Sequence, residues 1–160
     1  MTQDDIEIIK KQYRKKAYEI ITSFRQGNET GLSLFTRYFN IIVKGKKRKY
    51  YCGAGFNFFS VTPNGEIYPC HRIIGKEDFQ LGIVPNLQFY DNDFMKIVGF
   101  SVNEKNLCQD CWAKHFCGGG CAANTFYNNA NTEQNNMICE LTKELAENAL
   151  KIYYAVYSSI

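Results

Sequence analysis

The 160-residue chain lacks several features that define large classes of protein. No stretch approaches the 18 consecutive apolar residues of a transmembrane helix. The segment Met1–Asp5 has neither the positive charge nor the apolar run of a secretory signal, so we expect a cytoplasmic protein without a membrane partner. A charged fraction of 22% and a net charge of +3 do not indicate disorder. No Gly-Lys-Ser/Thr follows the triple glycine at 118–120, so no phosphate loop is indicated.

What the chain does contain is enough apolar material for a packed core: 45% of its residues are apolar, with 12 Phe and 11 Tyr. Apolar residues recur with the helical period after a capping box at Thr2 and Asp5, and that helix should end near Gly27. A second helix is predicted around 34–42, ending near Gly45.

Beyond residue 50 the pattern changes to short extended segments. Residues 56–61 and 66–68 flank a strong turn sequence and predict a β-hairpin, and 81–84 predicts a further strand. The remaining expectations are a short helix at 91–98, irregular structure at 108–121, a solvated Asn-rich loop at 124–136 and a final helix at 137–157. The sequence therefore predicts an α+β fold, with a small β-hairpin and Cys-rich loops flanked by N-terminal helices and a C-terminal helix.

The seven cysteines are the strongest chemical signal. An odd number of thiols in a reducing compartment argues against a disulfide framework and favours metal or cluster ligation. Their spacing is Cys-x12-Gly-x4-Cys, a gap of 37 residues, Cys-x2-Cys-x5-Cys-x3-Cys, a gap of 17 residues, and Cys. The positions are Cys52, Cys70, Cys108, Cys111, Cys117, Cys121 and Cys139.

Counting ligands favours iron–sulfur clusters over zinc. A structural zinc site takes four ligands and would leave three thiols over. A [4Fe–4S] cluster also takes four thiolates but can function with one iron open, so seven thiols suit two clusters. Zinc remains the alternative. Cys139 is expected at the start of the final helix, where the helix N-terminus would stabilise a thiolate.

The whole spacing resembles the SPASM domain, the C-terminal extension of many radical S-adenosylmethionine enzymes that modify ribosomal peptides or mature sulfatases. All seven cysteine positions match, over Cys52 to Cys139. The words Cys-Gly-Ala-Gly at 52–55, Val-Thr-Pro-Asn-Gly-Glu-Ile-Tyr-Pro-Cys-His at 61–71 and Cys-Trp-Ala-Lys at 111–114 look most like maturases that form thioether crosslinks in cysteine-rich peptides (SCIFF-type maturases). The resemblance implies a helical linker or docking segment at 1–50 and a twin-cluster domain at 51–160.

The resemblance also implies how the ligands divide between two [4Fe–4S] clusters. Cys52, Cys70 and Cys121 match the first auxiliary cluster. The second has a full set: Cys108, Cys111, Cys117 and Cys139. Some family members have an extra cysteine six residues after the first, where this chain has Phe58, so the first cluster would keep an open fourth site.

One family motif is missing. The radical-generating core uses Cys-x3-Cys-x2-Cys, which this sequence does not contain. The resemblance therefore implies that the chain works with a radical S-adenosylmethionine domain outside it and is inactive in radical chemistry alone. Its role would be electron transfer, binding of the ribosomal precursor peptide, or both. The alternative is a zinc-stabilised structural or binding module without a redox role.

Other conspicuous residues have plainer interpretations. His71 and His115 could complete the first cluster, but a surface or hydrogen-bonded histidine is the commoner case. The basic run Lys44–Lys49 favours a solvated hinge over a nucleic-acid contact, because no recognition module surrounds it. Gly118, Gly119 and Gly120 adjoin predicted ligands, where backbone N–H groups can approach sulfur closely.

Overall fold

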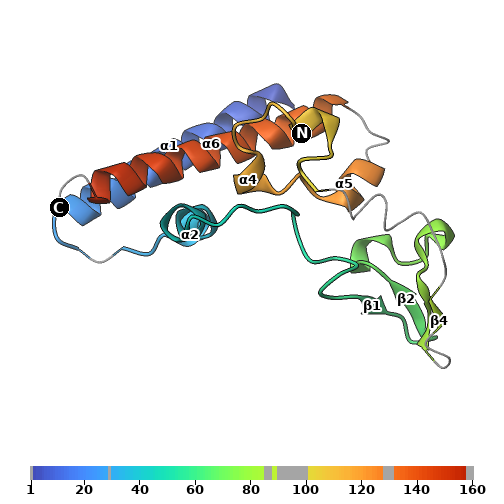
Figure 1. Cartoon of the computed structure of the whole chain (residues 1–160). Helices are drawn as coiled ribbons and strands as arrows, with labels where there is room; N and C mark the ends of the chain where they lie inside the picture. The colour runs from blue at the N-terminus through green and yellow to red at the C-terminus, as the bar shows by residue number, and fades with distance from the viewer. Residues whose placement is uncertain (1, 29, 85–87, 90–100, 128–131, 158–160) are drawn as a thin grey trace. The chain divides into compact units, whose positions relative to one another are not determined.

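The computed structural model describes residues 2–28, 30–84, 88–89, 101–127 and 132–157 (Figure 1). It combines helices with a small antiparallel sheet, which confirms the α+β class. The chain forms two compact units, one of residues 1–48 with 131–160 and the other of residues 49–130. We call them the helical unit and the cysteine-rich unit. The last helix, which the sequence prediction grouped with 51–160, belongs to the helical unit.

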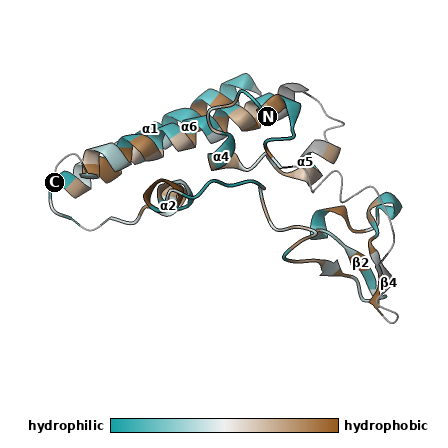
Figure 2. Cartoon of the chain, viewed as in Figure 1, coloured by the Kyte–Doolittle hydropathy of each residue, from teal (hydrophilic) through white to brown (hydrophobic). Residues whose placement is uncertain are grey.

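The helical unit is built on two long helices, α1 (Gln3–Arg25) and α6 (Thr132–Tyr157), which lie side by side (Figure 1). A 3₁₀ turn, η1 (Ser33–Phe35), leads into α2 (Thr36–Lys44), which packs on α6. Apolar and polar residues alternate along these helices (Figure 2), as the helical period predicted. The buried apolar residues on α1 and α6 are Ile6, Ala17, Ile20, Met137, Ala146, Ala149, Ile152 and Ala155.

The predicted signals at the helix ends are confirmed. The Thr2 hydroxyl accepts a hydrogen bond from the Asp5 N–H, and the Asp5 carboxylate accepts one from the Thr2 N–H, which completes the capping box. Gly45 ends α2 with φ of 61°, a left-handed conformation that glycine adopts without steric cost.

Two ion pairs join α1 to α6. Lys10 Nζ lies 2.5 Å from a Glu140 carboxylate oxygen. Arg14 donates two hydrogen bonds, of 2.8 and 2.7 Å, to the two carboxylate oxygens of the buried Glu144. The Asn148 amide donates a third, of 2.8 Å. The Arg14 guanidinium holds the pKa of Glu144 below its ordinary value, although burial of the carboxylate opposes this shift.

The cysteine-rich unit contains four short antiparallel strands in the order β1 (Ser60–Val61), β2 (Glu66–Tyr68), β3 (Gly82–Ile83) and β4 (Gln88–Phe89). The predicted hairpin is confirmed: Val61 pairs with Ile67, and the Gly65 N–H donates to the Thr62 carbonyl across the turn. The other elements are short turns and helices: η2 (His71–Ile73), η3 (Glu77–Phe79), η5 (Asn106–Cys108), α4 (Lys114–Cys117) and α5 (Ala122–Tyr127).

A small apolar core supports these elements. Its buried members are Ile67, Tyr68, Ile73, Phe79, Leu81 and Ala123. Phe126 on α5 packs edge-to-face on Phe79, with 4.6 Å between the ring centroids. Cys70 and Cys121 are half-buried and pack against the same core, so the core fixes the positions of two thiols.

Three sequence predictions need correction. The predicted loop at 124–136 contains most of α5 and the start of α6. The stretch 108–121, predicted to be irregular, includes the helical turn α4. Because α6 begins at Thr132, Cys139 lies in its third turn, where the field of the helix N-terminus no longer acts. The predicted helix at 91–98 lies outside the described residues.

Candidate metal centre

None of the seven cysteines, all of which lie among the described residues, forms a disulfide bond. Six belong to the cysteine-rich unit, and Cys139 is exposed on α6 in the helical unit. Within the described residues, no group of three or more His, Cys, Asp or Glu side chains is arranged to hold a metal ion. The contacts of the individual thiols show which cysteines lie close to one another.

Cys52, Cys70 and Cys121 line one pocket of the cysteine-rich unit. The rest of the wall is mostly apolar, with Tyr50 and Ile73 among its members. These three thiols come from three separate chain segments, and they are the three that the resemblance assigns to the first cluster. Three thiols in a mostly apolar wall are a donor set that would suit a group held by three thiolates, although the side chains are not arranged around a metal ion as they stand.

Backbone hydrogen bonds hold the Cys52 loop against the strand end that carries Cys70. The Gly53 carbonyl accepts bonds from the N–H groups of three following residues, Phe56, Asn57 and Phe58, which closes a tight turn directly after Cys52. Gly55, with φ of 76°, donates its N–H to the Pro69 carbonyl at 3.2 Å. Because Pro69 immediately precedes Cys70, this bond fixes the separation between the two cysteine-bearing segments.

Gly118 brings the segment before Cys52 close to the loop that carries Cys121. Its φ is 82°, and a Cβ added there would lie 2.3 Å from the Tyr50 carbonyl oxygen. Any larger residue would force the two segments apart. The triple glycine is thus explained at Gly118 by close backbone approach, and the predicted approach of its N–H groups to sulfur stays a prediction.

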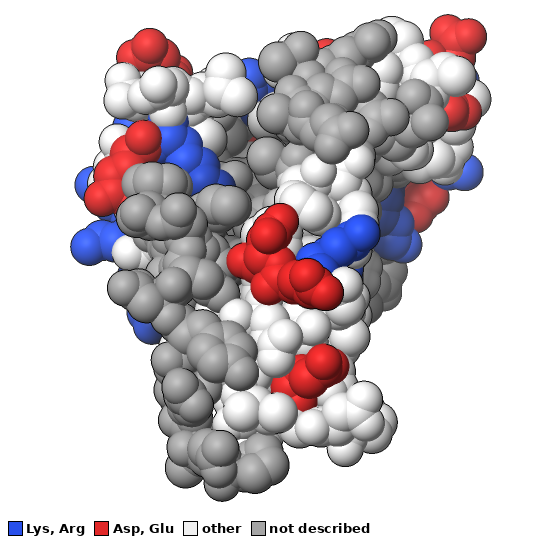
Figure 3. Space-filling model, turned by 90° about the vertical axis from the view of Figure 1, so that its right-hand side faces the viewer, with Lys and Arg blue, Asp and Glu red and all other residues white. Residues whose placement is uncertain are grey.

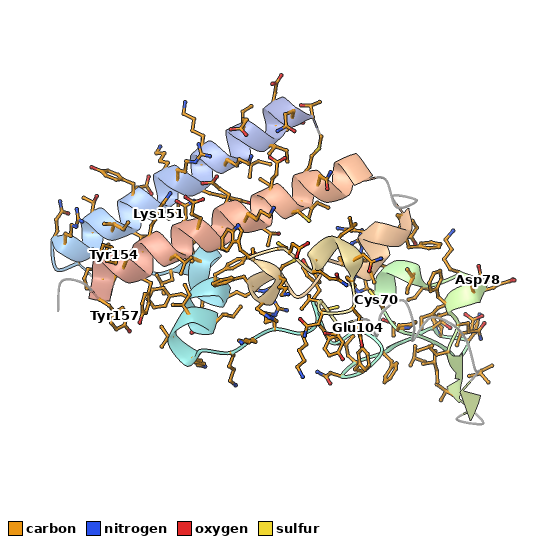
Figure 4. All side chains as sticks on the ribbon, turned by 45° about the horizontal axis from the view of Figure 1, so that its top comes forward. Cys70, Asp78, Glu104, Lys151, Tyr154 and Tyr157 are labelled. Carbon is orange, nitrogen blue, oxygen red and sulfur yellow. The ribbon has the colours of Figure 1, made fainter. Side chains whose placement is uncertain are left out.

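Cys70, labelled in Figure 4, lies between β2 and η2. It caps the turn η2, where its sulfur accepts a hydrogen bond of 3.4 Å from the Arg72 N–H. The Arg72 guanidinium donates from Nη1 to the Cys121 sulfur at 3.6 Å. His71 is exposed, with its Nδ1 4.0 Å from the Cys70 sulfur. Phe58, at the position of the extra family cysteine, is an exposed residue next to β1.

Cys108, Cys111 and Cys117 form a second neighbourhood on successive turns. The Cys111 N–H donates to the Cys108 carbonyl, and Cys117 follows at the end of α4. Burial raises the pKa of the Cys108 thiol; nearby Lys105 and Lys114 lower that pKa, while Cys117 and Cys111 raise it. The Lys114 N–H in turn donates to the Cys111 carbonyl, so consecutive turns carry these three residues, which are three of the four assigned to the second cluster.

Lys105 lies beside both groups of thiols. It lines the pocket of Cys52, Cys70 and Cys121. Its ammonium group donates to the Gly119 carbonyl at 2.9 Å, in the loop between Cys117 and Cys121. Its own carbonyl accepts the Cys108 N–H at 2.8 Å. This lysine was not singled out from the sequence, where nothing marks it among the 19 cations.

Charges elsewhere on the molecule are mixed. Acidic and basic side chains lie next to one another on the face shown in Figure 3. Nucleic-acid interfaces are built on a clustered basic surface. No helix among the described residues has the length and apolar content needed to span a membrane.

The known proteins that resemble the chain do not indicate a function. No model of a known protein family matches the chain. An uncharacterised protein of Archaeoglobus fulgidus is 29% identical over 103 residues, which are 63% of this chain. The same residues are 25% of the archaeal protein, so the match spans about a quarter of that relative's length.

Proposed function

We propose that the chain is the auxiliary cluster domain of a radical S-adenosylmethionine enzyme that modifies a ribosomal peptide, with thioether crosslinking the favoured reaction. The observation that carries the proposal is the pocket lined by Cys52, Cys70 and Cys121. Cys70 and Cys121 lie 51 positions apart in the sequence, and Cys52 lies a further 18 before Cys70, yet all three line one cavity. Spacing in the sequence alone does not require this.

The remaining cysteines support a second centre. Cys108, Cys111 and Cys117 lie on consecutive turns of the chain, and in this proposal Cys139 completes the set. When bound, [4Fe–4S] clusters supply one-electron transfer and, at an open iron, a site for a thiolate. The protein's own contribution is to hold the thiols in a mostly apolar wall that includes Tyr50 and Ile73.

The partners in this proposal are a radical S-adenosylmethionine domain and the precursor peptide. About three quarters of the Archaeoglobus protein lies outside the matched residues, so that relative is long enough to include a further large domain. In this proposal the peptide thiol approaches from the side of Cys52, which is exposed. Electron transfer and peptide binding both fit this arrangement.

The decisive experiment measures iron, sulfide and zinc after anaerobic reconstitution, together with the absorption spectrum. We expect about eight iron and eight sulfide per chain and a brown chromophore that bleaches on reduction. One zinc without sulfide would contradict the proposal and leave a zinc-stabilised binding module.

A matched pair of variants tests the division of ligands. Cys117 and Cys121 are separated by three glycines yet are assigned to different centres. Cys117→Ser and Cys121→Ser should each remove about half the iron, but with different electron paramagnetic resonance signals lost. Loss of the same signal in both variants would overturn the assignment.

A further inference from the structure

Arg72 is the cation whose hydrogen bonds reach the sulfur atoms of the pocket. Its backbone N–H donates to the Cys70 sulfur at 3.4 Å, and its Nη1 donates to the Cys121 sulfur at 3.6 Å. One residue therefore contacts two of the three pocket thiols, through its backbone to one and its side chain to the other. These thiols are 51 positions apart in the chain.

The Arg72 side chain is held in place by other contacts. Its Nη1 also donates to the Asn124 side-chain oxygen on α5. The Arg72 carbonyl accepts a hydrogen bond of 2.6 Å from the Tyr127 hydroxyl, also on α5. The packing of Phe126 on Phe79 anchors α5 to the core. These contacts with α5 therefore hold the guanidinium next to Cys121, even though Arg72 is exposed.

We infer that Arg72 is a positioning residue of the pocket, which orients Cys70 and Cys121 and raises the reduction potential of the cluster bound there. This inference rests on the proposed function. Hydrogen bonds to ligand sulfur are among the factors that set cluster potentials. A positive donor stabilises the reduced state more than the oxidised state, because the reduced cluster carries one more negative charge.

Lys105 also lines the pocket, but its contact is of another kind. Its Nζ donates a hydrogen bond to the Gly119 carbonyl, a backbone acceptor. Lys76 is exposed, and it lies four residues after Arg72. Neutralising Lys76 removes a positive charge but keeps the hydrogen bonds of Arg72 to Cys70 and Cys121, which makes it the matched control.

The test is a redox titration of the reconstituted chain, with each cluster followed by electron paramagnetic resonance. At the potential where the wild-type first cluster is half reduced, Arg72→Met should give about a tenfold lower ratio of reduced to oxidised cluster. For a one-electron couple this is a shift of about 59 mV to lower potential. Lys76→Met should shift it much less, and the second cluster should move in neither variant.

Arg72→Lys separates charge from geometry. It keeps a cation but lacks the planar fork that reaches Cys121 and Asn124 together, so an intermediate potential is expected. Selective loss of the first cluster in Arg72→Met, with the second cluster intact and Lys76→Met fully loaded, also supports a positioning role. Equal potentials in Arg72→Met and Lys76→Met would overturn the inference while leaving the proposed function standing. A wild-type chain that binds no iron would overturn both.

Discussion

In the helical unit, the side chains of Ile6 and Ile152 are fully buried on helices of 23 and 26 residues. In the cysteine-rich unit, the longest described strand has three residues and the longest described helix has six. The first unit is stabilised by the buried apolar residues between α1 and α6, which we call the apolar seam, and by the ion pairs that join the two helices. The second gains it from turns, local hydrogen bonds and a core of a few residues.

Glycine use follows the same division. Among the described residues, six glycines with positive φ lie in the cysteine-rich unit and two in the helical unit. Such positions bend the chain tightly but contribute no side-chain burial. We infer from this difference that the helical unit can fold by itself, whereas folding of the cysteine-rich unit depends on the group that its thiols bind.

Iron removal should give the largest effect. Hydrogen exchange of the reconstituted and the iron-free chain should differ by at least about tenfold in protection within residues 49–130, because cluster binding contributes directly to folding free energy. Protection in α1 should hardly change. An equal loss of protection in both units would contradict this prediction and show that the two units unfold together.

Truncation of the apolar seam should give the next largest effect, in the opposite unit. Ile152→Ala should destabilise the helical unit by about 2–5 kcal/mol, through lost burial and the cavity that remains. Leu150, 39% exposed on the same helix, is the control and should cost less than about 1 kcal/mol when replaced by Ala. Urea unfolding followed by far-UV circular dichroism reports the helices, while fluorescence of Trp112 reports the cysteine-rich unit. A Trp112 transition that shifts as much as the helical one would argue against independent units.

The helices and the hairpin could be predicted from the sequence because their signals are local. The capping box at Thr2, the stop at Gly45 and the turn at 62–65 each act over a few residues. The start of α6 could not be predicted, because residues 132–136 have no apolar period. Extending an existing helix costs much less than starting one, so such a polar stretch can join it.

The candidate site divides in the same way. Cysteine spacing supplied the candidate residues, and the resemblance supplied their division between two clusters, which stays a prediction; three residues of one group line one pocket. Arg72 could not be found, because its contact with Cys121 links residues 49 positions apart. Likewise, α5 is stabilised by the packing of Phe126 on Phe79, a long-range contact that a local Asn-rich composition does not reveal.

The smallest effect we expect concerns the pH dependence of the helical unit. The pKa of Glu144 is lowered in the folded state, chiefly by Arg14, so the ionised carboxylate stabilises the fold above the ordinary Glu pKa. That contribution should be lost as the pH falls below 4.5 and through the lowered folded-state value. Glu144→Gln should therefore cost about 1–2 kcal/mol at pH 7, and the difference from wild type should shrink in acid.

Glu147 provides the control for that prediction. It pairs with Lys151 at 2.7 Å, but both side chains are more than half exposed, so Glu147→Gln should cost less than about 0.5 kcal/mol. Urea unfolding of the iron-free chain at pH 7 and pH 3.5, followed by circular dichroism, measures both variants. If the cost of Glu144→Gln did not change with pH, its source would be the shape and hydrogen bonds of the side chain. The ion pair would then add little to the seam, and apolar burial alone would distinguish the helical unit from the cysteine-rich one.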